Sequence, residues 1–350
     1  MSWQAESHER EETRMRSDEP APVLEWLEAR REFQSVVAVG HRLVHGMRRR
    51  EPIRVTSDIV QELRAATPFA PEHLPRELLL IEELLDRHPN LPQVACFDTT
   101  FHRDLPEVAS MLPIPRRYHA KGVRRYGFHG LSYAFLLEEL ARVAGADAAR
   151  GRIIFAHLGN GASLSAVQAG ACVDTSMGFT PASGLVMSTR PGDLDPGVMS
   201  YLAGTEGMSP QRLDAMVNYE SGLLGISETS SDMRNLLQRE ADDERAAQAV
   251  ALFCYQAKKW VGAFAAVLGG LDTLVFSGGI GEHSAPIRAR ICEGLGFLGI
   301  ELDHDRNAAH GRAISADGSR VTVCVIATDE ELMIARSVCR TLGLDAQYGR

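Results

Sequence analysis

The sequence of 350 residues lacks the features that mark several large classes of protein. It has no run of about 18 apolar residues, which a membrane-spanning helix requires, so we expect no such helix. Its 37 lysines and arginines are outnumbered by 46 aspartates and glutamates, and the net charge of −9 argues against a broad surface for nucleic acid. The first 20 residues lack the apolar core of a secretory signal, and none is expected there.

Cysteine is scarce, and its spacing forms no pairs. None of the six cysteines belongs to a Cys-x-x-Cys motif, and most of them lie within apolar runs. Scattered cysteines are typical of buried free thiols in a reducing compartment, whereas disulfide frameworks and zinc sites need recurring spacings. We therefore expect free thiols and a cytoplasmic protein.

The remaining composition is that of a globular chain. Hydrophobic residues make up 45% and charged residues 24% of the sequence, which excludes collagen, coiled coil and general disorder. At about 150 residues per domain, the length corresponds to two domains. We place a mobile polar arm over residues 1–20, a first domain over 21–150 with 331–350, and a second domain over 151–330.

Apolar periodicity predicts an α/β protein with mixed sheets flanked by helices. In the second domain a hairpin series comes first, and strands then alternate with helices. The first domain reads as the same order without its opening strands. Strands are expected at 35–39, 93–97, 152–156, 163–168, 171–174, 273–276 and 321–326. The main helices are expected at 24–33, 53–63, 78–87, 131–143, 245–268 and 330–342.

Two glycine-rich turns follow predicted strands, at His157–Gly161 (HLGNG) and Ser277–Gly281 (SGGIG). Glycine lets main-chain N–H groups approach an anion closely. Either turn alone is equally compatible with an ordinary connection, but two at strand ends in one domain favour a nucleotide site. No Gly-Lys-Ser/Thr follows them, so they are not Walker A loops, and their spacing does not fit a dinucleotide fingerprint.

Five charged or titratable residues stand out at strand ends and in turns. Asp98 ends a predicted strand, where a carboxylate commonly binds Mg²⁺, although an aspartate there also caps helices. Glu330 has the same two interpretations, since acids complement a helix N-terminus. The guanidinium groups of Arg42 and Arg190 match carboxylate or phosphate, with a solvated surface position as the alternative. His129, beside a glycine, offers an imidazole to an oxyanion or to a structural hydrogen bond.

Ten segments taken together resemble the acetate kinase family. They follow one another in the family's order from about residue 23 to the C-terminus, which makes the resemblance specific. The segments are GHRLVHG (40–46), CFDTTFH (96–102), RRYGFHG (124–130), HLGNGA (157–162), DTSMG (174–178), GLVMSTRPGDLDP (184–196), ESGLLGI (220–226), SSDMR (230–234), SGGIGE (277–282) and ATDEELMIAR (327–336).

The resemblance implies a two-domain, ribonuclease H-like fold of the actin, sugar-kinase and Hsp70 type. It implies reversible, ATP-dependent phosphorylation of acetate to acetyl phosphate by direct in-line transfer, with Mg²⁺ or alternatively Mn²⁺. A cytoplasmic homodimer that binds ATP and acetate or a similar short carboxylate is implied, with neither nucleic acid nor membrane as partner. A sugar kinase of the same fold class is a more distant alternative.

The resemblance also assigns roles to matching residues. Asp98, His129 and Arg190 match catalytic positions, where Asp98 organises Mg²⁺ and the other two stabilise the transition state, and Glu330 matches a metal ligand. The matching substrate-binding positions are Arg42, Val44, Phe128 and Pro181. The matching nucleotide-binding positions are His157, Leu158, Gly159, Asn160, Gly161, Asp232, Met233, Arg234, Gly279, Ile280, Gly281, Glu282 and His283.

The sequence departs from the family pattern in three places. Family members open with a strand, an N-x-G-S-S-S-x-K loop and a second strand, and nothing in residues 1–34 resembles them, so an incomplete first domain is expected. A misplaced start or disrupted gene, a neighbouring polypeptide that supplies the segment, and a nucleotide-binding protein without efficient catalysis would each explain this. His283 replaces a common asparagine. Phe69 replaces a leucine near the acyl pocket, which leaves acetate, propionate and other short acids open.

Overall fold

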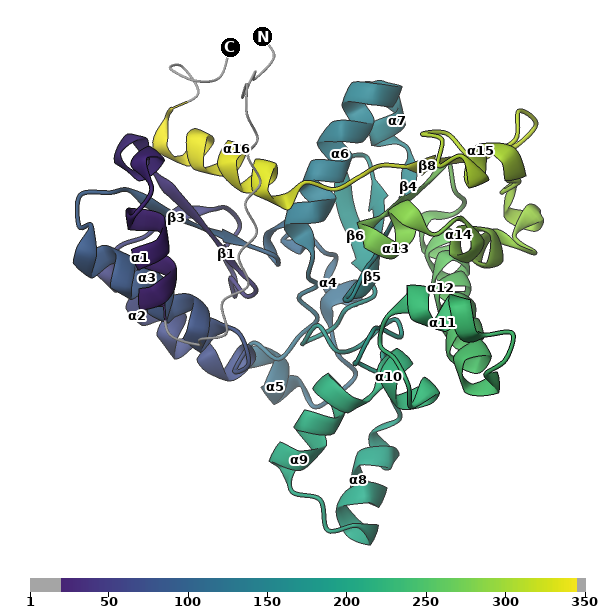
Figure 1. Cartoon of the computed structure of the whole chain (residues 1–350), viewed down its shortest axis with the longest axis horizontal. Helices are drawn as coiled ribbons and strands as arrows, with labels where there is room; N and C mark the ends of the chain where they lie inside the picture. Colours follow the sequence, from purple (N-terminus) through teal and green to yellow (C-terminus); the bar gives the residue numbers. More distant parts are fainter. Residues whose placement is uncertain (1–19, 345–350) are drawn as a thin grey trace. The chain divides into compact units, whose positions relative to one another are not determined.

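The computed structural model describes residues 20–344, so the arm predicted over 1–20 lies, except for Pro20, outside the described residues. The chain divides into two compact units (Figure 1): unit 1 holds the chain up to Arg103 and from Asp329 onward, and unit 2 holds Asp104–Thr328. This division by contacts differs from the predicted boundary at 150 and 151, because helix α6 (Gly130–Ala144) contacts strand β4 (Arg152–Leu158) of unit 2. The assignment of residues 104–150 to the first domain stays a prediction.

Unit 1 is built on a three-stranded sheet with the order β1-β3-β2. Strand β1 (Val39–Leu43) runs parallel to β3 (Gln93–Phe97), and β2 (Ile53–Arg54) runs antiparallel to β3. The other elements of this unit are α1 (Ala21–Glu28), η1 (Arg31–Ser35), α2 (Ser57–Ala65), η2 (Thr67–Phe69), α3 (Leu74–Arg87), η3 (Thr100–His102) and α16 (Glu330–Leu342).

The pair β1 and β3 has two covered faces. Leu43 and Phe97 point to one face, where they join a buried apolar core with α2 and α3. Gly40 lies on the opposite face beneath α16, where an added Cβ would come within 2.8 Å of Val338 Cγ2 and still closer to Ile334. Because side chains alternate along a strand, Arg42 shares the face of Gly40 and α16.

The strand predicted at 35–39 is wrong in its bounds. Main-chain pairing begins only at Val39, whose N–H donates to the Pro92 carbonyl at 2.9 Å, because the partner strand β3 itself begins at Gln93. Val36 and Val37 are exposed. The helix predicted over 53–63 begins only at Ser57, the first residue of α2. Ile53 and Arg54 form β2 and pair with β3 instead.

Unit 2 contains a five-stranded mixed sheet with the order β6-β5-β4-β7-β8. Its first three strands form the predicted hairpin series, and β7 and β8 then run parallel to each other and to β4, which makes the sheet mixed as predicted. The strands are β4 (Arg152–Leu158), β5 (Ala162–Gln168), β6 (Ala171–Thr175), β7 (Thr273–Ser277) and β8 (Thr322–Val325). Because β4 and β7 are parallel neighbours, with His157 opposite Ser277, the two glycine turns that follow them leave the same sheet edge side by side.

Helices cover this sheet. The 25-residue helix α12 (Glu244–Leu268) packs on β4 and β5, and α6 (Gly130–Ala144) contacts β4. The remaining helices of unit 2 are α4 (Glu107–Ser110), α5 (Arg116–Ala120), α7 (Ala146–Arg150), α8 (Pro196–Thr205), α9 (Pro210–Ala215), η4 (Met216–Glu220), α10 (Gly222–Ser227), α11 (Met233–Arg239), α13 (Gly278–His283), α14 (Ala285–Cys292), η5 (Gly296–Leu298) and α15 (His304–Ala308).

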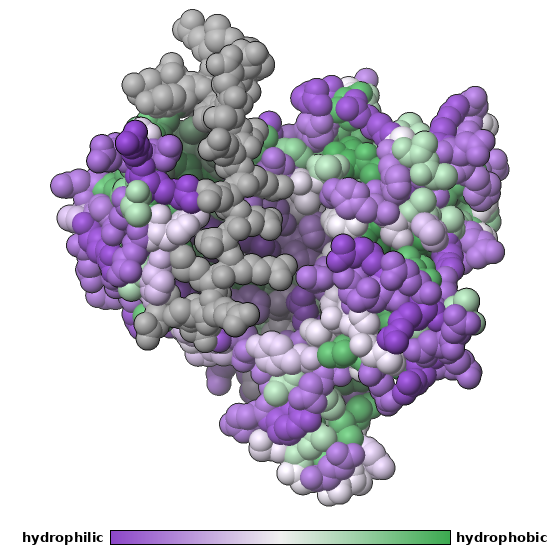
Figure 2. Space-filling model, in the orientation of Figure 1, coloured by the Kyte–Doolittle hydropathy of each residue, from purple (hydrophilic) through white to green (hydrophobic). Residues whose placement is uncertain are grey.

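The free state of the thiols fits the sequence expectation. Mainly hydrophilic residues cover the face drawn in Figure 2. Within residues 20–344, none of the helices is both long and apolar enough to span a membrane. All six cysteines are free thiols, and five of them are buried.

Candidate active site

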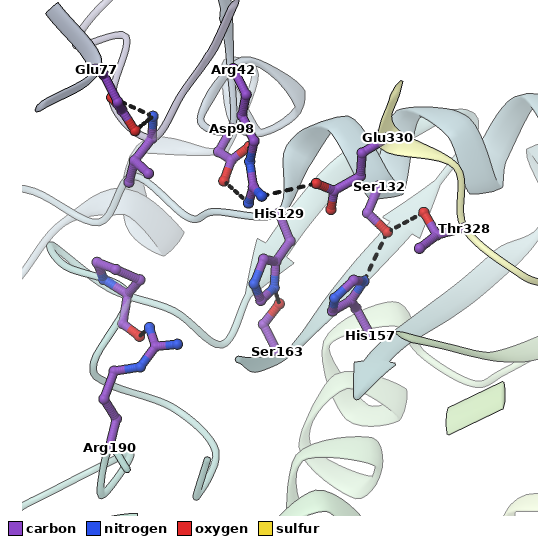
Figure 3. Close-up of polar contacts among 12 residues, drawn as sticks. Arg42, Glu77, Asp98, His129, Ser132, His157, Ser163, Arg190, Thr328 and Glu330 are labelled. Carbon is purple, nitrogen blue, oxygen red and sulfur yellow. Dashed lines mark hydrogen bonds and ion pairs between the residues drawn. The ribbon is translucent and has the colours of Figure 1, made fainter. Parts of the chain in front are cut away.

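In unit 1, the structure brings together three of the predicted site residues (Figure 3). Arg42 binds the Asp98 carboxylate with two parallel hydrogen bonds, Nε to Oδ1 at 3.0 Å and the second terminal nitrogen to Oδ2 at 2.8 Å. The other terminal nitrogen of Arg42 lies 3.1 Å from Glu330 Oε2. The Asp98 side chain is 2% exposed and the Arg42 side chain is 43% exposed, so Arg42 contacts a buried acid while part of its own side chain is open to solvent.

Local structure explains how these three residues meet. Arg42 lies on β1 and Asp98 directly follows β3, and the two strands are adjacent and parallel. Glu330 is the first residue of α16, which packs on the same face of the sheet. Burial opposes the charge of Arg42, but the neighbouring Asp98 and Glu330 carboxylates raise the pKa of its guanidinium further above neutrality. Burial raises the pKa of the Glu330 carboxyl.

Glu77 of α3 was not predicted, although it belongs to this cluster. Both of its carboxylate oxygens accept from the Val44 N–H, at 3.2 Å each. Burial raises the pKa of Glu77 to about 7, and the nearby Asp98 charge adds to this effect. The position of an acid near the start of a helix was the only sequence signal, and it also fits ordinary helix-end stabilisation.

In unit 2, the two predicted glycine turns are in contact. A Cβ added to Gly278, whose φ is +74°, would fall 2.8 Å from the Leu158 carbonyl oxygen, and one added to Gly159 would lie 3.9 Å from the Gly279 nitrogen. Glu282 fixes the second turn, since its Oε1 accepts from the Gly278 N–H at 2.8 Å and from the Thr328 N–H at 3.2 Å. The turns therefore form one glycine-lined region at the ends of β4 and β7.

His129 is held in an unusual position. Its φ of +59° is in the left-handed region, which few residues other than glycine adopt. Its Nδ1 lies 2.8 Å from Ser163 Oγ, and the Tyr133 hydroxyl also bonds to that oxygen. If Tyr133 donates to Ser163, the single serine proton goes to Nδ1, which leaves the neutral imidazole with its proton on Nε2.

His129 Nε2 and the Arg190 guanidinium converge on one glycine of the first turn. A Cβ added to Gly161 would lie 2.9 Å from a terminal nitrogen of Arg190 and 3.0 Å from His129 Nε2. The other terminal nitrogen of Arg190 donates to the Pro181 carbonyl at 2.6 Å. Burial lowers the pKa of Arg190. Two cation or N–H donors therefore face the same main-chain turn, which is suited to an anion.

His157 is positioned by residues that the sequence analysis did not single out. Its Nδ1 lies 2.9 Å from Ser132 Oγ, which in turn lies 2.8 Å from Thr328 Oγ1. The rings of His157 and His129 are adjacent, with centroids 4.4 Å apart. Ser132 and Ser163 lie outside the ten segments and Thr328 lies within the segment 327–336, but only the fold brings these residues to the histidines.

The side chains of five of the other predicted residues lie outside these contacts. Phe128 is buried beside His129, and Val44 follows β1 in unit 1. Asp232 caps α11, with Oδ1 accepting from the Arg234 N–H at 2.8 Å, and the side chains of these two residues form an exposed ion pair. The His283 side chain is exposed, 3.9 Å from Glu282.

Comparison with known proteins agrees with this fold and these motifs. The model of the acetokinase family matches residues 5–336. An acetate kinase of Rhodopseudomonas palustris (strain ATCC BAA-98 / CGA009) is 48% identical over 326 residues, which are 92% of this chain and 81% of the relative. A propionate kinase of Citrobacter rodentium is 45% identical over 313 residues, 89% of this chain and 78% of the relative. The crystal structure of Porphyromonas gingivalis acetate kinase superposes with a TM-score of 0.86 at 37% identity, covering 92% of this chain and 84% of that one.

The α/β fold, with its paired glycine turns, is that of a phosphotransferase that acts on a carboxyl group. The chain belongs to the acetokinase family.

Proposed function

We propose that this protein transfers the γ-phosphoryl group of ATP to acetate, giving acetyl phosphate and ADP, and that the reaction is reversible. The observation that carries this proposal is the convergence of His129 Nε2 and Arg190 on Gly161. A phosphoryl group in transit carries negative charge on its equatorial oxygens, and donors arranged in advance around it supply most of the catalysis.

The chemistry requires little covalent help from the protein. An acetate oxygen attacks the γ-phosphorus, a new O–P bond forms, and the bond to the β-phosphate oxygen breaks, so ADP leaves with that electron pair. Acetate is already ionised at neutral pH and needs no general base. Two anions must approach each other, and we assign Arg42 to the carboxylate and Arg190 with His129 to the transferring group.

The two glycine turns are proposed to hold the nucleotide. Residues 157–161 would bind phosphate oxygens through main-chain N–H groups, and residues 279–283 would line the second side. Residues 232–234 are proposed to lie on the adenosine side. Val44, Phe128 and Pro181 are proposed to contact the methyl group of the acid.

A divalent ion fits the acids of unit 1. Mg²⁺ uses one or two carboxylates and completes its shell with phosphate oxygens and water, and Asp98 and Glu330 offer carboxylate oxygens around one guanidinium. Within residues 20–344, no group of three His, Cys, Asp or Glu side chains is placed to hold a metal ion. A Mg²⁺ site that uses one or two carboxylates does not need such a group. We propose that Glu330 and Asp98 hold Mg²⁺ or Mn²⁺, which would neutralise phosphate charge when bound.

Two further properties are proposed, the first from the family resemblance and the second from the cysteines. The protein is a homodimer. It is also cytoplasmic, because its six cysteines are free thiols, as in a reducing compartment.

Trapping of acyl phosphate with hydroxylamine tests the function. Purified protein with ATP, Mg²⁺ and acetate should give acetohydroxamate at enzyme-like turnover, and omission of acetate is the control. ATP binding without product would favour the second candidate, a nucleotide-binding relative with weak or no catalysis. Propionate belongs in the same assay, because a propionate kinase is 45% identical to this chain.

A further inference from the structure

We propose that Glu77 is a positioning residue, which anchors the main chain at Val44 and thereby fixes how Arg42 presents its guanidinium to a carboxylate substrate. The proposal rests on the proposed function of Arg42. It adds a residue of α3 to a site otherwise formed by β1, β3 and α16.

The peptide group between Leu43 and Val44 is held from both sides. On one side the Leu43 carbonyl accepts from the Asp98 N–H at 3.0 Å. On the other side the Val44 N–H donates to both oxygens of Glu77 at 3.2 Å. This peptide comes directly after Arg42 and Leu43, so its orientation determines where β1 ends and how the following turn leaves it.

The anchor itself is rigid. Glu77 lies in the first turn of α3, and its neighbours Leu74 and Leu78 are buried in the core of unit 1 together with Leu43. A negative charge at this end of a helix is stabilised by the helix dipole. The carboxylate is therefore held at a fixed place relative to β1.

A role as an ion-pair partner of Arg42 does not explain Glu77. Arg42 already has hydrogen bonds to both oxygens of Asp98 and an ion pair with Glu330. A third carboxylate nearby adds repulsion from Asp98, and the hydrogen bonds of Glu77 described above go to the main-chain N–H of Val44 instead. Its contribution is geometric, and a neutral acceptor of the same length should replace it.

Three variants of α3 separate these roles. Glu77→Gln keeps an acceptor at the same reach without the charge, Glu77→Asp keeps the charge but shortens the reach, and Glu83→Ala removes an acid that pairs with Arg87 on the same helix. We expect Glu77→Asp to raise the KM for acetate about tenfold, the cost of one buried hydrogen bond. Its KM for ATP should change less than twofold, and Glu77→Gln and Glu83→Ala should stay within threefold of the wild type for both substrates.

Equal rises in both KM values, or a Glu77→Gln enzyme as weak as Glu77→Asp, would overturn the proposal. The ¹⁵N and ¹H shifts of the Val44 amide, measured without substrate, provide a readout independent of turnover. These shifts should move in Glu77→Asp and remain close to the wild type in Glu83→Ala. If the wild type forms no acyl phosphate, the proposed function fails, whereas an unmoved Val44 amide in Glu77→Asp contradicts the anchoring by Glu77 itself.

Discussion

Arg42 occupies both oxygens of the Asp98 carboxylate, at 3.0 and 2.8 Å, although Asp98 is 2% exposed and Arg42 reaches solvent. The buried acid thus has its charge neutralised within the protein, while the remaining nitrogen of the guanidinium bonds Glu330. This arrangement makes Arg42 important for stability, in addition to the substrate binding proposed for it.

Arg42→Ala should therefore destabilise the fold. A buried carboxylate left without its partner costs about 3–5 kcal/mol. Urea unfolding of the wild type and of Arg42→Ala under the same conditions measures this loss, and an unchanged free energy of unfolding would contradict the pairing argument.

Arg190→Ala, in contrast, should lower turnover and leave stability almost unchanged. Its guanidinium donates to the Pro181 carbonyl and faces Gly161, and burial lowers its pKa, so its removal should leave stability almost unchanged. Turnover should fall about 10²–10³-fold, as for the loss of one transition-state donor. Steady-state kinetics combined with thermal melting tests this, and near-normal turnover would refute the catalytic role.

Ser163→Ala should weaken catalysis through His129. The serine hydroxyl lies 2.8 Å from Nδ1, and when it donates there the neutral imidazole carries its proton on Nε2. Without this contact both tautomers are populated, and kcat should fall about tenfold, or ~1.4 kcal/mol, with the KM for ATP little changed. Tyr133→Phe keeps the serine and should lose less. A Ser163→Ala enzyme with wild-type kcat would contradict this role of Ser163 in orienting the His129 proton.

Glu77 should make the stability of the protein depend on pH. Its folded pKa of about 7 lies above the ordinary value of 4.5, mainly because of burial. The folded state therefore binds this proton more tightly, so its contribution to stability falls as pH rises from about 4.5 to 7 and then stays constant. Glu77→Gln should remove this slope. Unfolding free energies at pH 5, 6, 7 and 8 for both proteins measure it, and parallel curves would exclude Glu77 as the source.

The sequence predicted much of the fold because strongly apolar strands and glycine turns are local signals. The sheet of unit 2 and the helix beginning at Glu330 have the predicted order, and Arg42, Asp98 and Glu330 meet as their motifs imply. The predicted start of β1 was wrong. The first residue of the partner strand β3 determines where pairing begins, and the apolar run before Val39 does not.

The supporting residues were missed for a different reason. Ser132 lies 25 residues from His157 in the chain, and Ser163 lies 34 residues from His129, so no local spacing connects them. Glu77 is 33 residues from Val44 and resembles any acid near a helix start. Contacts of this kind exist only once the strands and helices have packed.

The absence of a side chain at Gly40 has a consequence two residues along the strand. A methyl group there would push against Val338 and Ile334 and act as a wedge under α16. Because Glu330 begins that helix, even a small tilt would lift its carboxylate off Arg42. The missing side chain of Gly40 thus helps to set the distance between Glu330 and Arg42, although neither residue is adjacent to it in the sequence.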